Sequence, residues 1–194
     1  MKNNTKQFGI ITILIILATL SRLIEHPLNF VPISAMILFG AAHFEKKWQV
    51  FLIPFGATLL SDLWLTPGFI NTGAYISYGL ILLFGIKLYS SKISSSNIFI
   101  GSLGSGLIFF IVSNFMVWMN PAYINVSLTS PSLLACYIDG LSFYRDGGYP
   151  LLFCNPFLNT VISNVFYSAI LFGSYYALQI KFRILKLQHI KYSK

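Results

Sequence analysis

Apolar residues occur in long blocks along this chain, and short polar segments separate the blocks. Blocks of this kind are typical of membrane-spanning helices, because one crossing needs about 20 mainly apolar residues. We therefore predict an all-α integral membrane protein, in which residues 1–194 form a single transmembrane domain. The predicted bundle has six transmembrane helices, at residues 8–24, 32–44, 48–64, 75–88, 98–119 and 156–178.

The longest break between apolar blocks is a loop over residues 120–155. Within it, the segment "TSPSLLACYIDG" has a serine cap, a proline in the first turn and a glycine stop, which together predict a short helix. A basic tail follows the last block at residues 179–194, and it either is a simple cytoplasmic anchor or binds anionic lipid. The helices at 32–44 and 75–88 are short for a hydrocarbon layer of about 30 Å.

The distribution of lysine and arginine predicts the orientation. With the N-terminus inside, eleven of these residues lie on the inner side and only Arg22 and Arg145 lie on the outer side. Cytoplasmic loops carry the excess of positive charge in membrane proteins, so both termini are predicted to be cytoplasmic. An even number of crossings is then required, which agrees with six.

Composition supports this class and removes others. The chain is 56% hydrophobic and 9% charged, whereas a soluble domain carries about 25% charged residues. The net charge of +8 is a topology signal, so we predict no nucleic-acid partner.

The apolar run after Phe8 lacks a clear cleavage pattern and is interpreted as a retained helix. Cys136 and Cys154 have no metal-site spacing, and they are apolar fillers or a disulfide pair.

Polar and aromatic residues from distant segments converge on the predicted outer side. A few placed polar groups within apolar walls are typical of small-molecule sites. We predict that a substrate site is formed by Arg22, Glu25, His26, Asp62, Tyr75, Tyr78, Asn114, Trp118, Tyr144, Arg145 and Asn159.

Arg22 and Asp62 are the most informative of these residues, because charges near lipid need compensation. Arg22 could pair with Asp62, with Glu25 or with a solute, and an Arg22–Asp62 pair could simply fix the first helix against the third. A similar choice applies to the last helix, where Thr160, Asn164 and Ser168 recur every four residues on one face. Such a stripe serves either interhelical hydrogen bonds or a ligand.

Enzyme signatures are lacking in the sequence. There is no HExxH, no GxSxG, and the "GSLGSG" segment at 101–106 lacks the lysine of a phosphate-binding loop. We therefore predict no catalytic residue, metal site or cofactor. The small residues of "GSLGSG" and of "FGAA" at 39–42 allow close helix approach, either inside the bundle or to a partner's helix.

Several segments carry a resemblance when taken in order: "HPLNFVPISAMILFGAAHF", "SDLWL", "YISYGLILLFG", "GSLGSGLIFFIVSNFMVW" and "SLLACYIDGLSFY". Together they resemble an uncharacterised family of small bacterial membrane proteins labelled as transport proteins. The size, six helices and cytoplasmic termini also resemble the substrate-binding S-components of energy-coupling factor (ECF) vitamin transporters. That resemblance implies the bacterial cytoplasmic (inner) membrane, an outward-facing pocket, and a transmembrane coupling protein with ATPases as partner.

The expected function is therefore binding of a small polar or vitamin-like solute at the outer face, for uptake. An alternative is a non-catalytic structural or accessory subunit of a larger membrane complex, in which the outer polar residues pair with one another. A proton-coupled carrier that uses Asp62 or Glu25 is a third reading. No acidic residue lies in the middle of a predicted helix, which counts against that third reading.

Overall fold

The computed structural model describes residues 2–65, 67, 71–119, 132–142 and 153–182. Within these residues the chain forms seven α-helices, one 3-10 helix and no strand, so the all-helical prediction is confirmed. The elements are α1 (Lys2–Leu20), η1 (Ser21–Leu23), α2 (Ile33–His43), α3 (Lys47–Leu65), α4 (Thr72–Leu88), α5 (Ser95–Trp118), α7 (Leu133–Ser142) and α8 (Pro156–Lys181).

Among the residues that the structure describes, four helical segments are long and apolar enough to cross a membrane, namely Thr5–Leu23, Trp48–Leu65, Ser95–Trp118 and Pro156–Lys181. The chain thus has the features of a membrane protein. Two further apolar helices, α2 and α4, are shorter, with 11 and 17 residues. At a rise of about 1.5 Å per residue, α2 is only about 16 Å long, which is about half of a hydrocarbon layer.

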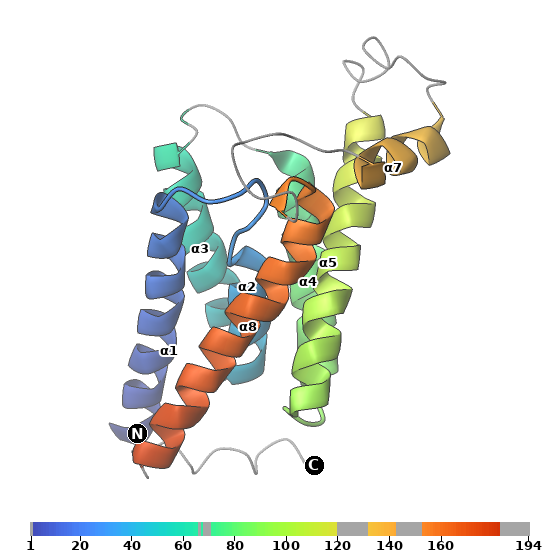
Figure 1. Cartoon of the computed structure of the whole chain (residues 1–194). Coiled ribbons are helices and arrows are strands. Elements are labelled where there is room, and N and C mark those ends of the chain that lie inside the picture. The colour runs from blue at the N-terminus through green and yellow to red at the C-terminus, as the bar shows by residue number, and fades with distance from the viewer. Residues whose placement is uncertain (1, 66, 68–70, 120–131, 143–152, 183–194) are drawn as a thin grey trace.

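Consecutive long elements alternate in direction (Figure 1). The first turn of α1 and the last turn of α8 lie at one end of the bundle, and α7 lies at the other, which we name the α7 end (Figure 1). The start of α1 also meets the end of α2, where the rings of Phe8 and Phe44 are 5.8 Å apart. The α7 end holds η1, the end of α5 and the start of α8.

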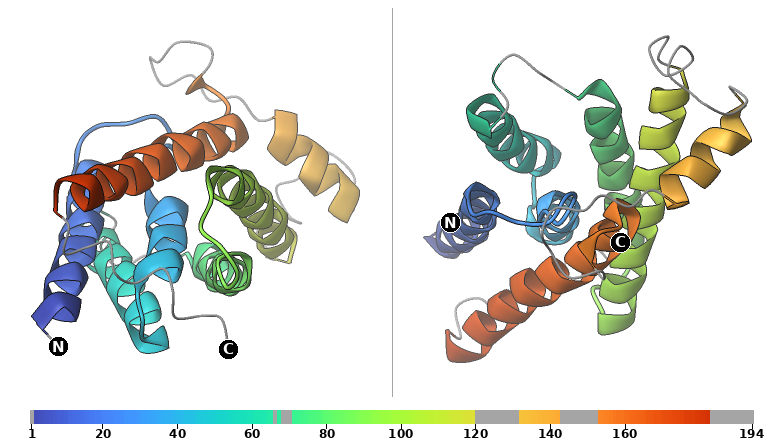
Figure 2. Two further views of the ribbon diagram at one scale, coloured as in Figure 1. Left: turned by 90° about the horizontal axis from the view of Figure 1, so that it is seen from below. Right: turned by 45° about the horizontal axis from the view of Figure 1, so that its top comes forward.

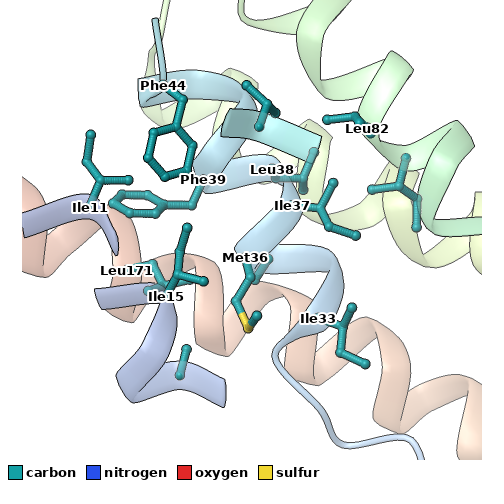
Figure 3. Packing of buried hydrophobic residues seen from close by; sticks show 14 of the residues in the cluster. Ile11, Ile15, Ile33, Met36, Ile37, Leu38, Phe39, Phe44, Leu82 and Leu171 are labelled. Carbon is teal, nitrogen blue, oxygen red and sulfur yellow. The ribbon is translucent and has the colours of Figure 1, made fainter. Parts of the chain in front are cut away.

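Helix α2 is the centre of the bundle. All residues from Ile33 to Gly40 are buried, and α2 contacts α1, α3, α4, α5 and α8 (Figure 2). A helix that is apolar on every side is stable only when neighbours surround it. Figure 3 shows side chains of α2, such as Met36 and Phe39, packed beside Ile11 and Ile15 of α1.

The connection from η1 to α2 is not helical over residues 24–32, yet it runs into the bundle beside α8. The Asn159 amide donates a hydrogen bond to the carbonyl of Leu28 at 2.8 Å, and the Ser163 hydroxyl, which lies 3.0 Å from the Thr160 carbonyl, also reaches that of Asn29 at 3.5 Å. Asn29 has a φ of 64°, a left-handed conformation that asparagine tolerates better than most residues. Irregular backbone within a membrane protein needs such internal partners, because lipid offers none.

An aromatic side chain fixes the same connection. Phe30 packs against three rings with centroid distances of 5.8 to 5.9 Å, those of Phe153, Phe166 and Tyr167. The connection is therefore packed against α8 and Phe153 through Phe30.

The helix bounds differ from the sequence-based ones at the ends. The first helix was expected over residues 8–24, but α1 begins at Lys2 and stops at Leu20, and Ser21 there donates its hydroxyl hydrogen to the Ala18 carbonyl at 2.7 Å. Helices α4 and α5 begin three residues early, because Asn71 and Ser94 cap them by accepting from backbone N–H groups. Apolar periodicity does not register such polar first turns.

The small residues of "GSLGSG" pack inside the chain. A side chain added at Gly101, Gly104 or Gly106 would press on Tyr89, Phe84 or Val161 respectively. Gly40 in the "FGAA" segment similarly faces Pro54 of α3. The structure thus favours the first of the two roles considered for these residues, which is close approach of the chain's own helices.

Candidate functional site

Arg22, the middle residue of η1, is a buried cation that is paired inside the chain. Its Nη2 atom lies 2.6 Å from Asp62 Oδ1, an ion pair between η1 and α3. Its Nη1 atom donates to the Ser61 hydroxyl and, at 3.4 Å, to the Thr58 carbonyl. The Tyr75 hydroxyl of α4 donates to Asp62 Oδ2 at 2.8 Å. We name these five residues the Arg22 cluster.

The spacing of the α3 residues explains the geometry of the cluster. Thr58, Ser61 and Asp62 stand at positions i, i+3 and i+4, which is one face of a helix. Ser61 also donates its hydroxyl hydrogen to the Thr58 carbonyl at 2.8 Å, so its oxygen remains as an acceptor for Arg22. The cluster is neutral overall and joins η1, α3 and α4. The sequence left Asp62, Glu25 and a solute as possible partners of Arg22, and in the structure Arg22 pairs with Asp62.

A separate pocket of about 440 Å³ lies at the α7 end, between α5, α7, α8 and the 24–32 connection. Small-molecule sites have volumes of about 300–1,000 Å³, so its size suits a small solute. We name it the α7 pocket. Its described lining consists of Leu28, Asn29, Phe109, Phe110, Ser113, Asn114, Val117, Cys136, Asp139, Gly140, Pro156, Phe157 and Thr160.

Helical periodicity produces the α5 and α7 walls of this pocket. On α5, the residues at positions i, i+3, i+4 and i+7 are Phe110, Ser113, Asn114 and Val117. On α7, Cys136, Asp139 and Gly140 follow the spacing i, i+3 and i+4. Each helix thus turns one face with both apolar and polar groups toward the same space.

Helix α7 is held against the rest of the chain by three hydrogen bonds to backbone carbonyls. The Tyr137 hydroxyl donates to Ile111 at 2.8 Å, and the Cys136 thiol donates to Asn114 at 3.4 Å. At the other end of α7, the Asn155 amide donates to Leu141 at 2.9 Å. Asn155 also caps α8 by accepting from the Leu158 N–H at 2.9 Å. One residue thereby links the pocket's α7 wall to its α8 wall.

Gly140 allows the closest approach between α7 and α5. A Cβ atom at this position would overlap the side-chain amide of Asn114. No flexible neighbour could relieve this overlap cheaply, because Asn114 is itself tied to the Phe110 carbonyl at 2.8 Å. The absence of a side chain at Gly140 therefore determines where the Asn114 amide can lie.

The predicted site residues fall into separate groups. Arg22, Asp62 and Tyr75 meet in the Arg22 cluster, and the Tyr78 ring lies 5.8 Å from that of Tyr75. Tyr78 also stacks at 5.8 Å on Phe109, which lines the α7 pocket. Asn114 lines the pocket itself.

The remaining predicted residues lie elsewhere. The Asn159 amide donates to the Leu28 and Phe153 carbonyls, both at 2.8 Å, so it serves the backbone beside the pocket. Glu25 is exposed, and the Nδ1 of His26 lies 2.6 Å from the Ile24 carbonyl. Trp118 ends α5 with its ring 5.7 Å from Phe115. Tyr144 and Arg145 lie outside the described residues.

The face of α8 first noted for Thr160, Asn164 and Ser168 is buried throughout. Asn164 donates to the Ser105 hydroxyl of α5 at 3.0 Å and to the Ser102 carbonyl at 3.4 Å. Asn164 therefore forms interhelical hydrogen bonds, which is one of the two roles that the sequence suggested for this face. Thr160, nearer the α7 end, lines the pocket.

Sequence reasoning missed several pocket residues, namely Phe109, Phe110, Ser113, Cys136 and Phe157. The signal was present as matching i, i+3, i+4 faces on α5 and α7, but it does not reveal that these two faces meet. Among the described residues, no group of three His, Cys, Asp or Glu side chains could hold a metal ion.

Comparison with known proteins gives one match. A family of unknown function, DUF6580, matches residues 2–187. Neither a curated protein nor a solved structure matches the chain. The family description names no activity, so the resemblance to transport proteins stays a prediction. Because the match covers nearly the whole sequence, the chain belongs to the DUF6580 family of unknown function.

Proposed function

We propose that this protein binds a small polar or vitamin-like solute in the α7 pocket, for uptake across the bacterial inner membrane. The observation that carries the proposal is a cavity of about 440 Å³ at one end of a membrane bundle, walled by aromatic rings and by a few polar side chains. Mainly apolar walls with few polar groups are the usual composition of small-molecule sites.

The proposal moves the site away from the Arg22 cluster. In that cluster Arg22 and Asp62 neutralise each other, and both carboxylate oxygens already have partners in the chain. A solute there would have to break a partly buried ion pair. Asn114 is the sequence-predicted residue that lines the α7 pocket, and we assign it the central polar contact of the solute.

The topology proposed with this function has six crossings, with the α7 end outside. The lysine and arginine asymmetry supports this orientation, since basic residues mark the cytoplasmic side. Helix α2 is too short to cross alone, but the 24–32 connection extends its path, and neighbouring helices surround it. Irregular backbone at that depth is tolerated because protein surrounds it.

A transmembrane coupling protein with ATPases remains the proposed partner. The basis for this partner is the resemblance to S-components alone. The chain would depend on such a partner for an ATP-driven step. The glycines of "GSLGSG" lend this partner no support, because they face the chain's own α4 and α8.

The proposal is tested by thermal unfolding of the purified protein with a panel of vitamins. A solute present at about 100 times its Kd should stabilise the protein by about 2.7 kcal/mol. Asn114→Leu should abolish the shift. Asn97→Leu, which changes the α5 asparagine at the opposite end of that helix, should retain it.

Two results would contradict the proposal. One is the absence of any stabilisation by the panel together with no uptake into proteoliposomes that hold the chain and its coupling complex. The other is a stabilisation that Asn114→Leu leaves unchanged.

The second candidate function is a structural or accessory subunit of a larger membrane complex. The internally paired Arg22 cluster favours it, because polar residues that were expected to meet a solute meet one another instead. That candidate also predicts no cavity at this end of the bundle. The α7 pocket is the reason we place solute binding first.

A further inference from the structure

Helix α7 has three different faces. Cys136 and Gly140 stand on the face that lines the α7 pocket. A second face, which we name the α7 stripe, carries three apolar side chains at positions i, i+4 and i+7, namely Leu134, Ile138 and Leu141. Asp139 is exposed, and at 3.6 residues per turn it lies at least about 100° around the helix from each residue of the stripe. One helix thus separates a packed side, an apolar side and a charged side.

The α7 stripe is strongly exposed, with exposed fractions of 69% for Leu134, 53% for Ile138 and 47% for Leu141. Single exposed apolar residues are common, but three on one helical face form a continuous patch. The helix has only 10 residues and is therefore about 15 Å long, too short to cross a membrane. An apolar helix of this length that is not buried in a core is typical of the membrane interface.

The direction of α7 fits an interfacial position. Helix α7 runs across the direction of α5 rather than along it (Figure 1), and it lies at the periphery of the bundle (Figure 2). Helix α5 is one of the segments that can cross the membrane. A helix that lies across a crossing helix at its end lies close to the plane of the membrane surface, which is the orientation of interfacial amphipathic helices.

The Tyr137 hydroxyl shows the level at which α7 lies. It donates to the Ile111 carbonyl of α5 at 2.8 Å, and Ile111 stands about 10 Å before the end of α5 at Trp118. Helix α5 has 24 residues and is about 36 Å long, so a hydrocarbon layer of about 30 Å leaves at most about 6 Å of it outside. When α5 crosses the layer, Ile111 therefore lies within it, and Tyr137 ties α7 to that depth.

The same contact places the α7 stripe beside the lipid-facing side of α5. Ile111 is 52% exposed and Phe115, one turn later, is 38% exposed, so this side of α5 meets lipid in a membrane. At about 100° per residue, Tyr137 stands on α7 between Gly140 of the packed face and Leu141 of the stripe. The stripe therefore continues the apolar surface of α5, and the lipids that cover one can cover the other.

We propose that α7 is an in-plane helix of the membrane interface, whose stripe inserts among lipid acyl chains at the α7 end while Asp139 faces water. Helix α7 contains no lysine or arginine, so the surface fits the acyl region of any lipid and does not depend on anionic head groups. The pocket then has one wall that lipid supports from outside. This inference goes beyond the proposed function and does not depend on whether the pocket binds a solute.

Nitroxide labels on single introduced cysteines test the proposal, in the full chain reconstituted into phosphatidylcholine vesicles. Paramagnetic resonance measures the accessibility of each label to oxygen, which concentrates in lipid, and to a water-soluble nickel chelate. The labels on the stripe are Leu134→Cys, Ile138→Cys and Leu141→Cys. The controls are Ile111→Cys for lipid, Ser90→Cys for water and Asp139→Cys for the charged side of α7.

The native cysteines are treated separately. Cys154→Ser removes the half-buried thiol in every variant, and the chain with this change alone measures any label on the buried Cys136. Thermal unfolding identifies variants that fail to fold. Because the stripe side chains are exposed, their replacement leaves the packed face of α7 unchanged, and each of the three positions is an independent test.

The stripe labels should resemble Ile111→Cys, with a ratio of oxygen to nickel accessibility several-fold higher than at Ser90→Cys and Asp139→Cys. Adding phosphatidylglycerol to the vesicles should not change this ratio. Three results would overturn the proposal. Nickel accessibility equal to that of Ser90→Cys would place the stripe in water. Shielding from both reagents would mean that protein covers it, either a second copy or another subunit. A lipid signal that appears only with phosphatidylglycerol would mean that head-group charge holds α7 on the membrane.

Discussion

The Arg22 cluster and the α7 pocket both collect polar residues at the α7 end, but they use them differently. In the cluster, each carboxylate oxygen of Asp62 meets a donor from the chain, Arg22 on one side and Tyr75 on the other. In the pocket, the Ser113 and Thr160 hydroxyls each donate to a carbonyl of their own helix, and both side chains line a space that would hold a small solute. Polar residues in a membrane protein can thus pair with one another across elements, as in the cluster, or line a cavity, as in the pocket.

The largest expected effect comes from breaking the cluster with Asp62→Ala. Arg22 is buried, and removing its counterion would leave a desolvated charge, which costs about 3–5 kcal/mol. Unfolding in detergent, followed by circular dichroism, measures the loss. The double variant Arg22→Met with Asp62→Leu should recover most of it, because an apolar pair needs no compensation. A single variant as stable as the wild type would mean that the pair does not hold η1 to α3.

Asn159→Leu is expected to have the next largest effect. Its amide donates to two backbone carbonyls, those of Leu28 and Phe153, and leucine would leave both without that donor. Buried unpaired groups cost about 1–3 kcal/mol each. The free energy of unfolding should fall, whereas Ser163→Ala should cost less, because the Ser163 hydroxyl bonds the Thr160 carbonyl of its own helix at 3.0 Å and reaches Asn29 only at 3.5 Å. If Asn159→Leu kept full stability and lost solute binding, Asn159 would belong to the site instead.

Gly140→Ala tests the pocket with little effect on the core. The added methyl group would displace the Asn114 amide, so solute affinity should fall by about tenfold, or about 1.4 kcal/mol. Gly173→Ala is the matched control, since a Cβ at Gly173 meets nothing within 4 Å. Titration with the most stabilising vitamin of the panel measures both variants. Equal affinity for both would show that the α5–α7 wall does not contact the solute.

The sequence predicts the fold class more completely than it predicts the residues of the candidate site. Apolar blocks predict helices because apolar side chains are stable both in the protein interior and in lipid. Helices α2, α3 and α8 begin within one residue of their expected starts. Those blocks do not show that α2 is central or that the 24–32 connection enters the bundle. Both facts follow from tertiary contacts, such as Asn159 with Leu28, across 131 positions of the chain.

The sequence predicted the Arg22–Asp62 pair but not the pocket, because the pocket depends on tertiary contacts. Charge compensation near lipid favours an Arg22–Asp62 pair, and that pair is present. The pocket, by contrast, depends on how α7 lies against α5. The close approach of Gly140 to Asn114 decides this, and neither residue reveals it through periodicity.

Tyr75→Phe gives the smallest expected effect and separates the two regions most cleanly. Its hydroxyl donates to Asp62 Oδ2, so its loss removes one hydrogen bond to a charged group, worth about 1.5–3 kcal/mol when buried and about 1 kcal/mol at this half-buried position. The remaining oxygen of Asp62 still meets Arg22, so the ion pair survives and solute affinity should not change. Tyr78→Phe is the control, because the Tyr78 ring stacks on Phe109 of the pocket and phenylalanine keeps that stack. Thermal unfolding and titration are measured on both variants. If Tyr75→Phe weakened solute binding without changing stability, the Tyr75 hydroxyl would act on the solute, and the Arg22 cluster and the α7 pocket would be one site.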